Sequence, residues 1–147
     1  MSHKPVVYIS PGHMDPYYTL EKAGLGPDVD LRVMQSPDRG YMDGAEACQA
    51  DAIMTWRTRI DAKAIDQLEH CKLIVRLGVG YDFVDVEAAA RKGIPVSNVP
   101  DYCTNEVADH TLALLLAITR GLPAYIDSVK QGTGQWEWSA AGSLYRM

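Results

Sequence analysis

The feature that most constrains the fold is a regular series of short apolar segments rich in β-branched residues. Five of them recur about every 21 residues, at Pro5–Ser10, Leu31–Gln35, Ala52–Trp56, Leu73–Leu77 and Ile94–Val99. Helix-like or turn-rich stretches separate them, and this alternation predicts βαβ units with a parallel sheet. Their centres (VVYI, AIM, LIV) are continuously apolar, which is typical of strands buried on both faces. We therefore expect an α/β fold with five parallel strands.

The stretches between these segments contain helical patterns. Asp61–Cys71 carries apolar residues at helical spacing and is expected to be an amphipathic helix. Val84–Lys92 is expected to be a second helix, capped by Asp82 or Asp85 and ended by Gly93. Two further short helices are expected, at Tyr17–Ala23 and Gly44–Ala50.

A different pattern begins after Pro100. Thr104 is a suitable N-cap, and nothing from Asn105 to Arg120 breaks a helix that would be about 24 Å long. Its centre, LALLLAI, is apolar nearly all round, which is typical of a helix buried between several elements. Five strands and the short helices between them do not supply enough surface to bury it, so we expect a further covering surface.

Composition excludes several classes of protein. The 147 residues are 47% apolar and 22% charged, as in ordinary globular domains. Acidic residues outnumber basic ones by 19 to 14, which argues against a nucleic-acid partner. Three cysteines without a CxxC fit a reducing compartment. No N-terminal signal peptide is visible. No pair of histidines and carboxylates has metal-ligand spacing. The longest apolar run, Leu112–Ile118, is far short of the roughly 20 residues that span a membrane. We expect a cytoplasmic protein with no membrane or metal.

The most informative loop is Gly78–Val79–Gly80, after the fourth predicted strand. Ligands of open parallel sheets bind beyond the carboxyl ends of the strands. Two glycines around one residue let the backbone approach a ligand and expose its N–H groups. It is not a GxGxxG fingerprint, because Phe83 takes the place of the third glycine and Asp82 would repel a pyrophosphate. Two interpretations stay open here: a tight strand-to-helix turn, or a site for a small anion.

Other candidates also have two interpretations. Arg57 and Arg59 would hold an anionic substrate, or are solvated loop cations. Arg76, inside a strand, belongs to an ion pair or points into a cleft. His110 is a general base or a packed histidine, and Cys103 has no histidine near it in the sequence. These residues do not make a complete catalytic set.

The stretch RLGVGYDFVDVEAAARKGIPVSNVPDYCTNEVADHTLALLLAITR, from Arg76 to Arg120, closely resembles the D-isomer-specific 2-hydroxyacid dehydrogenase family. It carries a GxGxD turn, a short helix, a GIPVxNVP strand and then an EVADH motif that opens a long helix. The resemblance implies that residues 1–102 form a flavodoxin-like substrate-binding lobe. Residues 103–147 would be the crossing helix and the start of a Rossmann coenzyme domain. The GxGxxG and the catalytic Arg, Glu and His would lie beyond Met147, so no catalytic residue is expected in this chain.

The resemblance also implies roles for four positions. The turn Gly78–Val79–Gly80 matches the loop whose amides hold the substrate carboxylate. Val79 further matches a position that touches the substrate or nicotinamide, and Thr104 one near the nicotinamide end of the cofactor. Arg57 lies on a loop that borders the cleft.

Two functions follow from the resemblance. The first is an oxidoreductase that uses NAD or NADP on a small D-2-hydroxy or 2-keto acid, works as a homodimer, and is inactive as these 147 residues alone. The alternative is a non-catalytic, corepressor-like module that senses a carboxylate or a dinucleotide. A receiver-like signalling domain is set aside, because the first and third predicted strands do not end in clustered acids.

Overall fold

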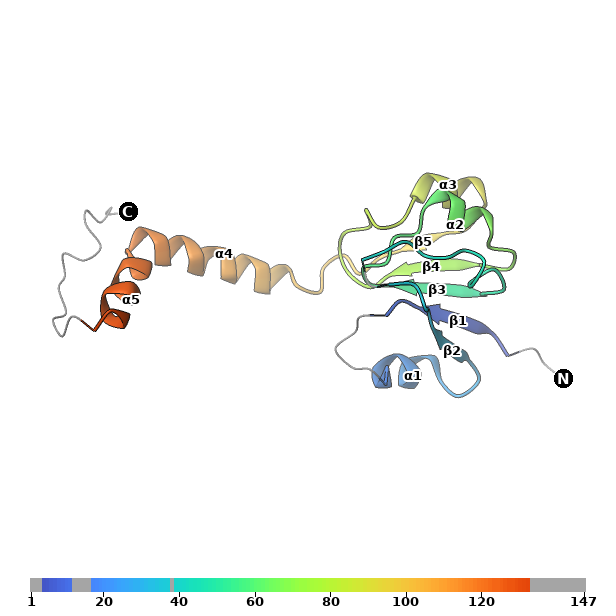
Figure 1. The fold of residues 1–147 in the computed structure, drawn as a ribbon, viewed down its shortest axis with the longest axis horizontal. Coiled ribbons are helices and arrows are strands. Elements are labelled where there is room, and N and C mark those ends of the chain that lie inside the picture. Colours follow the sequence, from blue (N-terminus) through green and yellow to red (C-terminus); the bar gives the residue numbers. More distant parts are fainter. Residues whose placement is uncertain (1–3, 12–16, 38, 133–147) are drawn as a thin grey trace. The chain divides into compact units, whose positions relative to one another are not determined.

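The computed structural model describes residues 4–11, 17–37 and 39–132, and the chain divides into two compact units (Figure 1). The first unit is Met1–Tyr102 and the second is Cys103–Met147.

A five-stranded parallel sheet forms the centre of the first unit. The strands are β1 (Val6–Ile9), β2 (Asp30–Val33), β3 (Ala52–Thr55), β4 (Leu73–Arg76) and β5 (Val96–Ser97). Their order is β2-β1-β3-β4-β5, and all four neighbouring pairs are parallel. This confirms the predicted α/β fold class, and each strand overlaps one of the five apolar segments. Parallel strands place all their carboxyl ends at one edge of the sheet.

Three helices connect the strands: α1 (Thr19–Leu25), α2 (Ala62–Asp66) and α3 (Val86–Arg91). Ile53 of β3 and Ile74 of β4 are fully buried in one core cluster with residues of α2 and α3. Figure 1 shows α2 and α3 side by side over this part of the sheet, and the two helices are in contact. The packing of these two helices fixes the loops that precede them, which lie at the carboxyl edge of the sheet.

The start of α3 is defined by one side chain. The Asp85 carboxylate accepts a hydrogen bond of 2.9 Å from the N–H of Ala88, which satisfies one of the unpaired donors of the first turn. Asp85 is therefore the N-cap, and the alternative cap, Asp82, is wrong. Asp61 caps α2 in the same way, with 2.9 Å to the N–H of Ala64.

Two helix predictions in this unit need correction. The helix predicted over 61–71 ends at Asp66, because the chain then turns so that the N–H of Glu69 donates to the carbonyl of Cys48 at 2.8 Å. The segment 44–50 forms turns and no helix. There the Asp43 carboxylate accepts from the N–H of Ala45 at 3.0 Å, a local bond that competes with helix formation.

The second unit contains α4 (Thr104–Thr119) and α5 (Leu122–Lys130), joined at Gly121 with φ +66° and bent by 68°. The predicted long helix is confirmed to within one residue at each end. The predicted N-cap is wrong: Thr104 is the first helical residue, and Cys103 precedes it without a side-chain capping bond. The helix α5 was not predicted, although Gly121 and a proline in its first turn are boundary signals.

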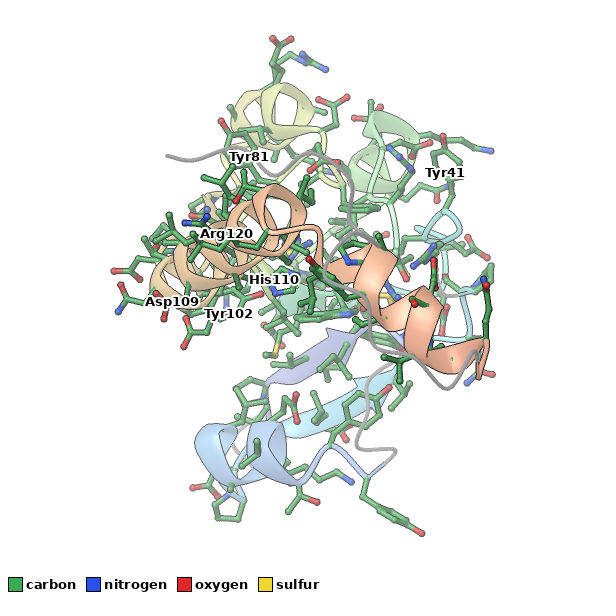
Figure 2. All side chains as sticks on the ribbon, turned by 90° about the vertical axis from the view of Figure 1, so that its left-hand side faces the viewer. Tyr41, Tyr81, Tyr102, Asp109, His110 and Arg120 are labelled. Atoms are coloured by element: carbon green, nitrogen blue, oxygen red, sulfur yellow. The ribbon has the colours of Figure 1, made fainter. Side chains whose placement is uncertain are left out.

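The apolar side chains of α4 and α5 are exposed. Neither helix has a buried residue, and Leu112 is 57% exposed. Asp109 and His110 are consecutive on α4 and both exposed (Figure 2). Within the described residues no single helix is long and apolar enough to cross a membrane, and only the bent pair α4–α5, taken together, meets the length and composition criteria. The covering surface expected for α4 stays a prediction.

The N-cap assignment makes a direct prediction about stability. Asp85→Ala removes the acceptor of the Ala88 N–H and is expected to lower the free energy of unfolding by about 1 kcal/mol. Asp82→Ala, its matched control three residues earlier, is expected to change it by less than about 0.5 kcal/mol. Urea denaturation of both variants checks this. Equal losses in the two variants would contradict the assignment of the cap.

Candidate functional site

The loops at the carboxyl edge of the sheet meet around the residues that follow β3, β4 and β5. Those after β3 include Trp56 and Arg57, those after β4 the turn Gly78–Val79–Gly80, and those after β5 Asn98 and Val99. Gly12 and His13 follow β1 in the sequence and lie outside the described residues. Because the strands are parallel, the residues that follow β3, β4 and β5 lie at one edge of the sheet.

The turn Gly78–Val79–Gly80 is tied down through its carbonyl groups. The Val99 N–H donates to the Gly78 carbonyl at 3.1 Å, and the Asn98 side-chain amide donates to the Val79 carbonyl at 2.7 Å. Gly78 is buried, whereas Val79 is 42% exposed and Gly80 is exposed. Within the described residues, the structure shows no acceptor for the N–H groups of Val79 and Gly80. Because both residues are exposed, we expect these N–H groups to be available as donors to a small anion.

Gly78 has no positive φ and lies against the flexible end of a neighbouring side chain. A Cβ at this position would overlap Nη1 of Arg76 and lie 2.8 Å from its Cζ. The Arg76 guanidinium in turn lies 5.6 Å from the ring centre of Trp56 and 5.7 Å from that of Phe83. Both distances are within the range of cation–π attraction. Arg76 therefore lies against Gly78 and between two aromatic rings.

The sequence predicted that Arg76 belongs to an ion pair or points into a cleft, and the structure shows no full match to either arrangement. No ion pair to it is present among the described residues, and its buried Nε has no hydrogen-bond partner there. The two aromatic rings, which the sequence did not point to, provide its principal contacts. The arginine places a positive charge beside the first glycine of the turn.

The loop after β3 is held by two threonines. The Thr55 hydroxyl donates to the carbonyl of Thr58 at 2.7 Å, and Thr58 is fully buried. The next residue, Arg59, is exposed and lies 5.1 Å from the ring centre of Phe83. Arg57 is half-buried and takes part in an interaction of its own. The loop therefore places Arg57 at the same edge as the turn, on a fixed backbone.

Three acidic side chains line a hollow of about 210 Å³ that Phe83 also lines. Asp61, Asp82 and Asp85 line it together with Arg59. Three carboxylates disfavour an anion there, because like charges repel at close range. An anion at this edge is better placed at the exposed N–H groups of Val79 and Gly80.

The remaining sequence candidates do not form a second site. Thr104 is exposed at the start of α4, and Cys103 and His110 belong to the same second unit. In the part of the chain that the structure describes, no group of three or more His, Cys, Asp or Glu residues is arranged to hold a metal ion.

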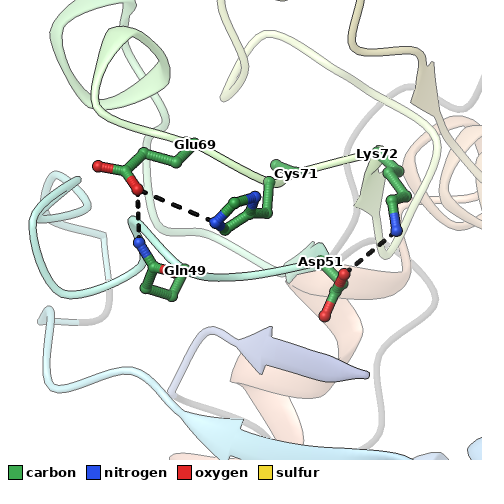
Figure 3. Close-up of a pocket in the computed structure, with 6 residues that line it drawn as sticks. Gln49, Asp51, Glu69, Cys71 and Lys72 are labelled. Atoms are coloured by element: carbon green, nitrogen blue, oxygen red, sulfur yellow. Dashed lines mark hydrogen bonds and ion pairs between the residues drawn. The ribbon is translucent and has the colours of Figure 1, made fainter. Parts of the chain in front are cut away.

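Another hollow, of about 650 Å³, lies at the opposite edge of the sheet (Figure 3). Asp51 and Lys72 directly precede β3 and β4 and form an ion pair of 3.3 Å, and Gln49 donates to Glu69 at 2.6 Å. Burial raises the pKa of the Cys71 thiol, whose hydrogen is donated to the Leu73 carbonyl at 3.4 Å. A raised pKa makes a thiol a poorer nucleophile. The polar groups of this hollow thus bond to one another.

Comparison with known proteins adds independent information. A family model described as the catalytic domain of D-isomer specific 2-hydroxyacid dehydrogenases matches residues 17–147. D-3-phosphoglycerate dehydrogenase of Mycobacterium tuberculosis is 38% identical over 119 residues, which are 80% of this chain and 22% of that protein. Glyoxylate reductase of Pyrococcus furiosus is 40% identical over 93 residues, which are 63% of this chain and 26% of the relative. The chain therefore spans about a fifth to a quarter of the length of these relatives.

Solved structures show the same fold. NADPH-dependent glyoxylate/hydroxypyruvate reductase of Sinorhizobium meliloti, in complex with NADP and malonate, has a TM-score of 0.68 and 26% identity. The match covers 99% of this chain and 42% of the reductase. A glyoxylate reductase from Paecilomyes thermophila has a TM-score of 0.74 at 24% identity, covering 98% of this chain and 46% of that one, and supports the fold alone.

The contact between Gly78 and Arg76 makes a second prediction. Gly78→Ala forces the guanidinium away from its two rings and is expected to cost about 1 to 3 kcal/mol of stability. The same substitution is expected to cost less when Arg76 has already been changed to Ala, because the overlapping group is gone. Denaturant unfolding of the two single variants and the double variant measures this difference.

The control for this experiment is Gly24→Ala. Gly24 lies in α1 with nothing within 4 Å of an added Cβ, so alanine is expected to raise stability by up to about 1 kcal/mol. Equal costs of Gly78→Ala with and without Arg76 would refute the contact as the reason for the glycine.

Proposed function

The chain belongs to the D-isomer specific 2-hydroxyacid dehydrogenase family, and from that premise we propose that it is the substrate-binding part of an oxidoreductase. The proposed substrate is a small D-2-hydroxy acid or the corresponding 2-keto acid. The proposed cofactor is NAD or NADP. The relatives that support this class of substrate are a D-3-phosphoglycerate dehydrogenase, a glyoxylate reductase and a glyoxylate/hydroxypyruvate reductase.

The observation that carries the proposal is the pair of accessible N–H groups at Val79 and Gly80. Preorganised backbone donors hold a carboxylate without the cost of reorienting side chains. Val79 presents its side chain beside these donors and is proposed to touch the substrate or the nicotinamide. Arg57, on the fixed loop after β3, is proposed to add a positive charge at the same edge.

The turn does not suit the pyrophosphate of the dinucleotide. Phe83 stands where a fingerprint would have its third glycine, and the Asp82 carboxylate lies 3.0 Å from the Cβ position of Gly80. We therefore propose that the cofactor is bound mainly outside these residues, with only its nicotinamide end approaching Val79 and Thr104. When bound, the nicotinamide supplies or accepts the hydride. This chain's own part is to hold and orient the acid.

The two units have different proposed roles. Residues 1–102 are proposed to be the flavodoxin-like substrate lobe, and residues 103–147 the crossing helix and start of the coenzyme-binding domain. Leu112, Leu115 and Ile126, all exposed, then belong to a surface that the rest of the protein and a second copy would cover in a homodimer. Three free cysteines are consistent with the cytoplasm as the proposed location.

A binding module without turnover is the second candidate function. Its supporting observation is the placement of the histidines: among the described residues, His70 lies by the hollow at the opposite edge and His110 in the second unit. Within the first unit the turn therefore offers binding groups with no described histidine beside it. Such a module would sense a carboxylate or a dinucleotide.

The substrate proposal is tested at Gly80. In the ¹⁵N–¹H spectrum of this chain, glyoxylate or hydroxypyruvate is expected to shift the amide signals of Val79 and Gly80. Gly80→Val places an isopropyl group beside these donors and is expected to abolish the shifts. Gly24→Val, at a helical glycine with open space around its Cβ, is expected to leave them unchanged. Unchanged shifts in a folded Gly80→Val protein would contradict the assignment of the turn as the carboxylate site.

The proposal that this chain binds the substrate while other parts of the protein supply the acid–base and cofactor-binding groups leads to a kinetic prediction. With NADH or NADPH and glyoxylate, the 147-residue chain alone is expected to show no loss of cofactor absorbance above background. The reason is that the acid–base and cofactor-binding groups are proposed to lie elsewhere in the protein. Steady turnover that follows the concentration of this chain would contradict the proposed division.

A further inference from the structure

The carbonyl groups of the turn are held by two donors of different kinds. The Gly78 carbonyl is held by the backbone N–H of Val99, at 3.1 Å, and this bond persists whatever side chain stands there. The Val79 carbonyl is held by the side chain of Asn98, at 2.7 Å, and this bond depends on one residue type. Both donors follow β5, which is paired with β4. The end of β5 thus bonds to two successive peptide groups after β4.

The geometry of the peptide group relates the direction of each of these carbonyl groups to the direction of the N–H group that follows it. In a trans peptide group, the C=O and the N–H point in opposite directions, and no cis peptide bond is present among the described residues. The Val79 carbonyl and the Gly80 N–H belong to one such group. Because the carbonyl points to Asn98, the Gly80 N–H points away from it.

The peptide between Val79 and Gly80 has no other described bond to fix it. Gly80 is exposed, and the Gly80 N–H has no acceptor within the described residues. Oδ1 of Asp82, at 3.0 Å, is the only described atom within 4 Å of the Cβ position of Gly80, so packing around this glycine is sparse. The Asn98 side chain is therefore the only described hydrogen-bond partner that fixes the direction of this peptide.

We propose that Asn98 is a positioning residue, which holds the Val79 carbonyl so that the Gly80 N–H is aimed at the carboxylate of the substrate. This inference rests on the proposed function of the turn and deepens it. Asn98 does not touch the substrate and does not take part in proton or hydride transfer. Its contribution is the fixed direction of one donor, which lowers the cost of binding an anion there.

The surroundings of Asn98 make it suitable for substitution. It is half-buried and lines a hollow of about 220 Å³ together with Tyr81, Val86, Val96 and Ser97. A smaller side chain extends an existing open hollow and does not create a closed cavity in the core, so the loss of stability is expected to be small. A change of binding can thus be separated from a change of folding.

The test compares three variants of this chain by titration with glyoxylate, followed by the amide signals of Val79 and Gly80. Asn98→Ala removes the donor and is expected to weaken binding about two- to tenfold, the worth of one ordinary hydrogen bond. Asn98→Gln keeps an amide donor and is expected to recover part of the affinity. Asn105→Ala, on the exposed face of α4, is the matched control and is expected to bind as the unaltered chain does.

Two further readouts distinguish positioning from a general effect on structure. The melting temperature of Asn98→Ala is expected to stay within a few degrees of the unaltered chain. The ¹⁵N signal of Gly80 without ligand is expected to move in Asn98→Ala and return toward its original position in Asn98→Gln. A positioning role predicts both.

Each other outcome overturns the inference in a recognisable way. If Asn98→Ala binds glyoxylate as the unaltered chain does, Asn98 is not a positioning residue, and the proposed function of the turn stands. If Asn98→Ala loses affinity only together with its fold, and Asn98→Gln restores neither, the role is structural. If glyoxylate shifts neither Val79 nor Gly80 in the unaltered chain, the inference and the proposed function both fail.

Discussion

The position of β4 between β3 and β5 is the constraint on which the rest of the first unit depends. Because all three strands are parallel, the residues that follow them meet at one edge. That arrangement brings Trp56 beside Arg76, and Asn98 beside the Val79 carbonyl. The helices α2 and α3 bury Ile53 and Ile74 beneath this edge and keep the strands in register. The turn is therefore held by the fold and not by its own sequence.

Charges of both signs lie near the turn at this edge. Asp61, Asp82 and Asp85 line the acidic hollow, and the Arg76 guanidinium lies against Gly78. Arg76 is half-buried and has no ion pair among the described residues, and contact with two aromatic rings offsets part of the cost of partial burial. The Arg76 charge favours an anion at the turn, the Asp82 carboxylate beside Gly80 opposes one there, and three carboxylates disfavour one in the acidic hollow.

Periodicity and local capping rules were sufficient to predict the five strands, α4 and a choice of two caps for α3. The helix α5 was not predicted, because the uninterrupted helical pattern ends before Gly121. Pro123 is nevertheless a helix-start signal. Sequence periodicity cannot predict the contact of Gly78 with Arg76 or the hydrogen bond from Asn98 to Val79. Each depends on residues that strand pairing brings together. The sequence pointed to the right turn but not to the residues that hold it, and the proposed roles of Arg57 and Thr104 stay predictions.

The most direct test of the central claim is a crystal structure of this chain with hydroxypyruvate. The account predicts that the carboxylate oxygens lie about 3 Å from the backbone nitrogens of Val79 and Gly80, with the Asn98 side chain still on the Val79 carbonyl. A carboxylate bound elsewhere, such as in the hollow beside Lys72, with the turn unoccupied, would contradict it.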